Sequence, residues 1–76
     1  TFLKNFYQKL LEIKWEAEEI HKSIYSVAEE IKVDKNIAFK TIYQILLGKD
    51  RGPRAGYFLS SLDKKFVLKQ IEKVIN

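Results

Sequence analysis

Apolar residues recur every three or four positions along most of this 76-residue chain, with little of the strict alternation that is typical of a strand. Such spacing places them on one side of an α-helix, which buries that side against its neighbours. The clearest case is a second helix over residues 17–31, whose apolar positions are Ala17, Ile20, Ile24, Val27, Ala28 and Ile31. The sequence therefore predicts an all-α fold, a small bundle of four to five short helices.

The first helix is predicted over residues 2–13, where Leu3, Phe6, Tyr7, Leu10 and Ile13 form one stripe. The rhythm slips at Trp15, which indicates either a bend near residues 14–16 or one continuous helix. Asp34 suits the N-cap of a third helix that ends near Leu47, with an inward stripe of Ala38, Ile42, Ile45 and Leu46. Gly48 is expected to end that helix, because glycine takes positive φ without penalty.

Residues 49–54, Lys-Asp-Arg-Gly-Pro-Arg, form the only turn-rich stretch of the chain. Pro53 suits the first position of a short fourth helix over residues 53–61, associated with Tyr57, Phe58 and Leu62. Asp63 is expected to cap a fifth helix that runs to Ile75, with a stripe of Phe66, Val67, Leu68, Ile71, Val74 and Ile75.

Several function classes are excluded by what the sequence lacks. There is no cysteine and one histidine, His21, so neither a disulfide framework nor a multi-histidine metal site is expected. His21 is interpreted as a surface residue, and no catalytic constellation is found. The longest uncharged stretches have eight residues, far fewer than the roughly 20 that cross a bilayer, so no membrane partner is expected.

Positive charge gathers in the second half of the chain, whose overall net charge is +4. Residues 1–38 hold six bases and seven acids, whereas residues 39–76 hold eight bases and three acids. Around the turn-rich stretch lie Lys40, Lys49 and the two arginines of the chain, Arg51 and Arg54. Arginine contacts phosphates and base edges in a bidentate manner, which favours a nucleic-acid partner.

The aromatic neighbours of this stretch support the same hypothesis. Tyr43 and Tyr57 flank it and could offer stacking faces to unpaired bases, although tyrosines on an apolar stripe can equally belong to the core. The simpler alternative is a helix connection kept soluble by its charges, with Arg54 paired to Asp50 or to an acid of the second helix.

The segment YQILLGKDRGPRAGYFLSSLDKKFVLKQIEKVI, from Tyr43 to Ile75, resembles the C-terminal end of class I lysyl-tRNA synthetases. The likeness begins with an aromatic residue that is separated by three residues from Leu-Gly-Lys, and Gly-Pro-Arg follows. A short helix and then a final helix after a charged cap complete the pattern. Glutamyl enzymes look similar but tend to have threonine in place of Leu47 and lack the basic Gly-Pro-Arg, so the lysyl assignment is preferred.

The resemblance implies an all-helical domain that cages an anticodon, in an enzyme that joins lysine to its tRNA using ATP. Residues 1–76 would be a single domain, the C-terminal fragment of a larger synthetase, as Thr1 without a methionine also suggests. It would need no cofactor, since ATP and lysine would bind the parent's absent Rossmann-type catalytic domain. The chain is expected to be monomeric and cytoplasmic and to bind the anticodon loop of tRNA(Lys). The RNA-binding residues that the resemblance implies are Tyr43, Lys49, Arg51, Gly52, Pro53, Arg54 and Ala55.

Two alternatives of other classes stay open at this point. The apolar stripes could dock on a partner chain, which would make the domain a protein interaction bundle. A helix-turn-helix DNA reader fits less well, because the connection between the third and fourth helices is about five residues long, contains proline and exceeds the usual three or four.

Overall fold

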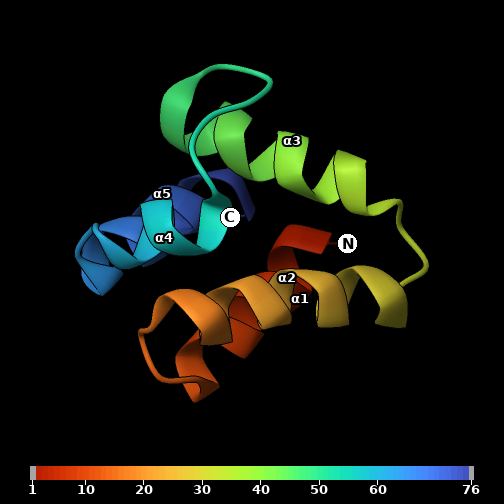
Figure 1. Ribbon diagram of the computed structural model, residues 1–76, viewed down its shortest axis with the longest axis horizontal. Coiled ribbons are helices and arrows are strands. Elements are labelled where there is room, and N and C mark those ends of the chain that lie inside the picture. The colour runs from red at the N-terminus through yellow and green to blue at the C-terminus, as the bar shows by residue number, and fades with distance from the viewer. Residues whose placement is uncertain (1, 76) are drawn as a thin grey trace.

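Five α-helices and no strand make up the computed structural model, which describes residues 2–75 (Figure 1). The all-α prediction is confirmed. The described helices include none that is long and apolar enough to cross a membrane. Their bounds are α1 Phe2–Glu12, α2 Ala17–Glu30, α3 Lys35–Leu47, α4 Ala55–Ser60 and α5 Lys64–Ile75.

The break between α1 and α2 is real, so the alternative of one continuous helix is wrong. Residues 13–16 are not helical, and the indole N–H of Trp15 donates to the carbonyl oxygen of Leu62 at 2.9 Å. The phase slip at Trp15 thus reflects a side chain that fastens this bend to the turn between α4 and α5.

Local signals set the ends of α2 and α3. The N–H groups of Lys32 and Val33 donate to the carbonyls of Glu29 and Ala28, and Lys32 has a positive φ of 56°. This Schellman arrangement normally has glycine where Lys32 stands. At α3 the predictions hold: an oxygen of Asp34 accepts the Asn36 N–H at 2.7 Å, and Gly48 ends the helix with φ 70°.

The fourth helix begins later than predicted, at Ala55 instead of Pro53. Arg54 has a non-helical backbone, with φ −51° and ψ 124°, so it is the N-cap, and its carbonyl accepts the Phe58 N–H at 2.8 Å. The fifth helix begins at Lys64, directly after Asp63 as expected.

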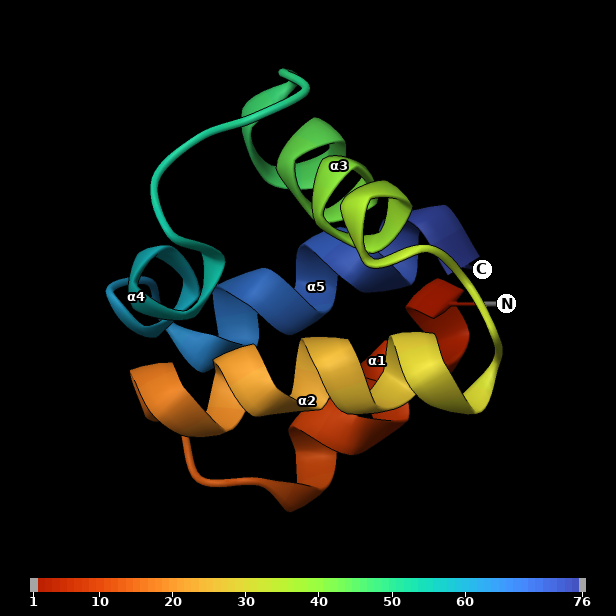
Figure 2. The ribbon, with the colours of Figure 1, turned by 45° about the vertical axis from the view of Figure 1, so that its right-hand side comes forward.

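The core lies where all five helices meet, and α2 packs against α1, α3 and α4 (Figures 1 and 2). Two predicted stripes need correction. In α3, Ile45 and Leu46 are only half-buried, while Tyr43 is buried in their place; in α5, Phe66 and Val74 are 47% and 55% exposed. The buried apolar residues are Phe2, Phe6, Leu10, Ile20, Ile24, Val27, Ala28, Ala38, Ile42, Tyr43, Ala55, Leu59, Val67 and Ile71.

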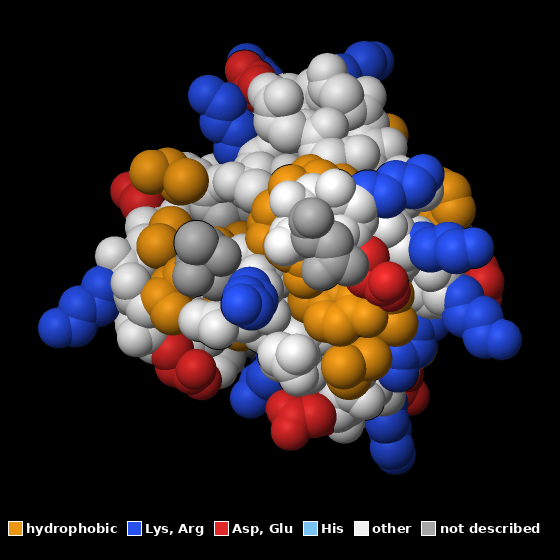
Figure 3. Space-filling view, turned by 180° about the vertical axis from the view of Figure 1, so that it is seen from behind, with side chains coloured by type: hydrophobic (Ala, Val, Ile, Leu, Met, Phe, Trp, Pro, Cys, Tyr) orange, Lys and Arg blue, Asp and Glu red, His pale blue; other side chains and the backbone are white. Residues whose placement is uncertain are grey.

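The first and last helices meet at their outer ends. Phe2 and Leu3 of α1 line one hollow together with Val74 and Ile75 of α5. Figure 2 shows the start of α1 near the end of α5, away from the loop that joins α3 to α4. Seen from behind, the surface carries apolar side chains among scattered charges (Figure 3).

Candidate nucleic-acid interface

Residues 48–54, here called the basic loop, lead from the end of α3 to the start of α4 (Figures 1 and 2). Lys49, Arg51, Gly52, Pro53 and Arg54 are all exposed, as an RNA-binding surface requires. Ala55 differs, because the whole residue is only 2% exposed. Of the predicted site residues after Tyr43, Ala55 is therefore the one that lies outside the exposed surface.

Tyr43 supports the basic loop from the core. Its side chain is 7% exposed, and its hydroxyl donates to the Pro53 carbonyl oxygen. A Cβ on Gly52 would lie 3.2 Å from a ring carbon of Tyr43, so the loop backbone rests against this ring. The expected stacking face is absent, and Tyr43 instead fixes where Pro53 and Gly52 lie.

Burial also affects the acidity of Tyr43. Removing the hydroxyl from water raises its pKa above the usual 10.0, and a hydrogen bond with the backbone of Ala55 opposes that shift. The tyrosine is therefore neutral at physiological pH and remains a hydrogen-bond donor to the loop.

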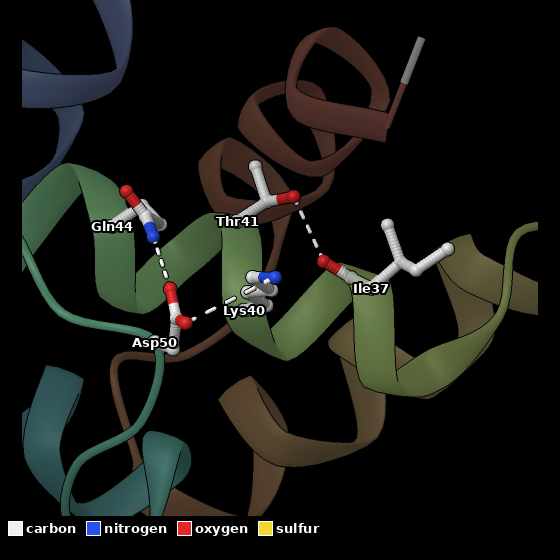
Figure 4. A network of polar contacts seen from close by, with 5 residues as sticks. All are labelled: Ile37, Lys40, Thr41, Gln44 and Asp50. Carbon is white, nitrogen blue, oxygen red and sulfur yellow. Dashed lines mark hydrogen bonds and ion pairs between the residues drawn. The ribbon is translucent and has the colours of Figure 1, made fainter.

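Asp50 attaches the outer part of the basic loop to α3 (Figure 4). One oxygen accepts a hydrogen bond from the side-chain amide of Gln44, and the other lies 4.0 Å from Nζ of Lys40. Both partners of the ion pair are more than half exposed, so the pair contributes little to stability. The expectation that Arg54 pairs with Asp50 or an acid of α2 is wrong: Lys40–Asp50 is the only ion pair among the described residues.

Arg54 lies instead beside an exposed aromatic ring. Its guanidinium carbon is 5.7 Å from the ring centroid of Tyr57, whose side chain is 60% exposed. A cation next to an accessible aromatic face is the combination that single-stranded nucleic-acid sites use. The accessible tyrosine ring at this loop is thus that of Tyr57, whereas Tyr43 is buried.

His21 is not the plain surface residue that the sequence suggested. It is half-buried, with its ring 4.9 Å from Tyr25 and 5.9 Å from Phe39. The spacing of His21 and Tyr25 by four residues on one helix hints at their contact. The approach of Phe39 from α3 depends on the packing of two helices and has no sequence signal.

Other site chemistry is not apparent in residues 2–75. That range holds no group of three histidine, cysteine or acidic side chains placed to bind a metal ion. The connection from α3 to α4 spans residues 48–54, which is longer than the three- or four-residue turn of a helix-turn-helix.

A family of proteins described as "Anticodon binding domain" matches residues 1–75. This chain belongs to the anticodon binding domain family. The match includes α1 and α2 and so extends the resemblance far beyond the segment from Tyr43 to Ile75. The exposed basic loop and the accessible Tyr57 beside it thus belong to a chain whose family is described as an anticodon binding domain.

Archaeal lysine–tRNA ligases are among the similar curated proteins. The enzymes of Thermoplasma volcanium and Thermoplasma acidophilum are 37% and 40% identical to this anticodon binding domain, over 99% of its length. That of Methanocaldococcus jannaschii is 39% identical over 91% of it. The chain spans only 15%, 15% and 13% of these relatives, respectively. No solved structure matches it.

Proposed function

We propose that this domain binds the anticodon loop of tRNA(Lys) for a class I lysine–tRNA ligase. Its family and its similarity to archaeal lysine–tRNA ligases support the assignment. In this proposal ATP and lysine bind a catalytic domain elsewhere in the parent enzyme, and the domain is monomeric and works in the cytoplasm. The observation that carries it is the basic loop, exposed and fastened to α3.

The loop supplies two kinds of contact in this proposal. Pro53 presents an exposed, rigid ring, and the loop's peptide groups can bond to the Watson–Crick edge of a splayed base. The Pro53 carbonyl already accepts the Tyr43 hydroxyl, so the recognition groups are those of the other loop residues. Lys49, Arg51 and Arg54 neutralise the adjacent phosphates.

The test is a titration of the tRNA(Lys) anticodon stem-loop into this chain at several salt concentrations, followed by backbone amide shifts. The amides of residues 49–55 should move. With two to four phosphates neutralised, log affinity should fall against log salt with a slope of about −1.4 to −2.8, from about −0.7 per contact. An affinity that does not respond to salt contradicts the proposal.

Matched variants locate the contact. Arg54→Ala should weaken binding and reduce the salt slope by about 0.7, the value for one phosphate. Pro53→Ala should weaken binding without changing that slope. Lys69→Ala removes an exposed cation from α5 and serves as the control. Equal losses from Arg54→Ala and Lys69→Ala would show diffuse attraction instead of a site.

A protein-binding role is the second candidate, because Leu11 of α1 and Phe66 of α5 are 48% and 47% exposed. Sedimentation of the chain alone separates the two. Self-association at micromolar concentration that Phe66→Ser abolishes would favour protein contact, whereas a monomer agrees with the first proposal.

A further inference from the structure

A hollow of about 180 Å³ lies beside the basic loop, between the first turns of α2 and the start of α4. Its lining includes Ala17, Glu18 and His21 from α2 and Arg54, Gly56 and Tyr57 from the other side. The hollow shares Arg54 with the loop, so a strand of RNA on the loop could continue into it.

Small residues allow the two helices to meet at this hollow. A Cβ on Gly56 would overlap the carbonyl oxygen of Ala17 and lie 3.0 Å from Cβ of His21. The backbones are therefore as close as glycine permits. The larger side chains stand around this contact and form the walls.

Two of those walls suit a flat aromatic ligand. Tyr57 is 60% exposed and has the Arg54 guanidinium 5.7 Å from its ring centroid. The ring of His21 packs beside Tyr25 and Phe39, which also contact each other, and among residues 2–75 its imidazole nitrogens have no hydrogen-bond partner. A neutral imidazole offers one donor and one acceptor, the groups that a base edge needs.

Charge decides which part of a nucleotide enters. Glu18 lines the hollow and Glu19 follows it, so a phosphate inside would meet like charge. Lys22 and Arg54, both exposed, can instead hold a phosphate at the rim. The volume is also below the roughly 300–1,000 Å³ of sites for drug-sized ligands, which favours a single base.

We propose that this hollow binds one unpaired RNA base, stacked on Tyr57 and contacted at its edge by His21. The inference rests on the proposed function and extends it, because it adds α2 to the recognition surface. The nucleotide bound here is a neighbour of the one on the loop, and Arg54 contacts the phosphate between them.

The experiment compares three variants for binding of the tRNA(Lys) anticodon stem-loop. Stacking on an aromatic side chain accounts for about 5- to 150-fold in affinity, so Tyr57→Ala should lose that much. Tyr57→Phe keeps the ring and should bind like the wild type. Phe66→Ala removes another exposed ring, 47% exposed on α5, and should have no effect.

Amide shifts place the base. RNA should move the Gly56 and Ala17 amides of the wild type and of Tyr57→Phe, and should leave them unmoved in Tyr57→Ala. If RNA binds but Tyr57→Ala behaves like Phe66→Ala, the hollow is not a base site and the proposed function still stands. If the stem-loop does not bind the wild type at all, both proposals fail.

Discussion

Replacing Gly56 by alanine tests the close approach of α2 and α4. In a helix this change is normally favourable by about 0.5–1 kcal/mol, because glycine loses more backbone entropy on folding. Here the added Cβ would overlap the carbonyl oxygen of Ala17 and lie 3.3 Å from its carbonyl carbon. The obstruction is backbone, which no rotamer change relieves.

The two terms can be compared. Overpacking a tight contact costs about 1–3 kcal/mol, and a backbone obstruction belongs at the upper end. After the propensity gain, Gly56→Ala should lower the free energy of unfolding by about 2 kcal/mol. In a domain of this size that corresponds to a drop in Tm of about 8–16 °C.

Urea and thermal unfolding followed by far-ultraviolet circular dichroism measure the effect, with Gly52→Ala as the control. At Gly52 the nearest obstruction is Cδ1 of Leu47, at 2.5 Å, on a partly exposed side chain that can turn away. Gly52→Ala should therefore cost less than about 1 kcal/mol, although Tyr43 is also near. A Gly56→Ala protein as stable as the wild type would refute the described helix contact.

Three further predictions concern single contacts. Lys32→Gly should raise the free energy of unfolding by less than about 1 kcal/mol, measured by urea unfolding, because relief of the left-handed backbone exceeds the entropy cost of glycine. Trp15→Phe leaves the Leu62 carbonyl without its donor and should cost about 1 kcal/mol or more by the same assay; an unchanged midpoint would disprove that role. Above pH 10 the unfolded chain loses the Tyr43 proton while the folded chain retains it, so stability should fall with rising pH, and less steeply in Tyr43→Phe.

The helix ends that sequence reasoning located are those fixed by neighbouring residues. Asp34 caps α3 through an amide two positions away, and Gly48 ends it through its own positive φ. Lys32 also has a positive φ, but lysine does not favour that conformation, so its identity does not predict it. The conformation goes with the hydrogen bonds of the Lys32 and Val33 N–H groups to carbonyls of α2. The α2 cap was therefore not predictable.

The candidate site divides in the same way. The exposed cations of the basic loop follow from composition and the Gly-Pro turn. The role of Tyr43 does not follow from the sequence, because its position fits both the apolar stripe of α3 and the edge of the loop. Its hydrogen bond joins it to Pro53, ten residues away. The enclosure of His21 and the hollow beside it require α2, α3 and α4 together, so no local pattern contains them.

The meeting of α1 and α5 at their outer ends makes the domain a candidate for circular permutation. Because Phe2 and Ile75 line the same hollow, a short glycine–serine linker could join the ends across it. New ends could then be opened at the exposed Arg51, between Asp50, which is bonded to Gln44, and Pro53, which is bonded to Tyr43. Such a permuted chain would keep the side chains of the loop but break its backbone. Its RNA binding would show whether the loop needs a continuous backbone.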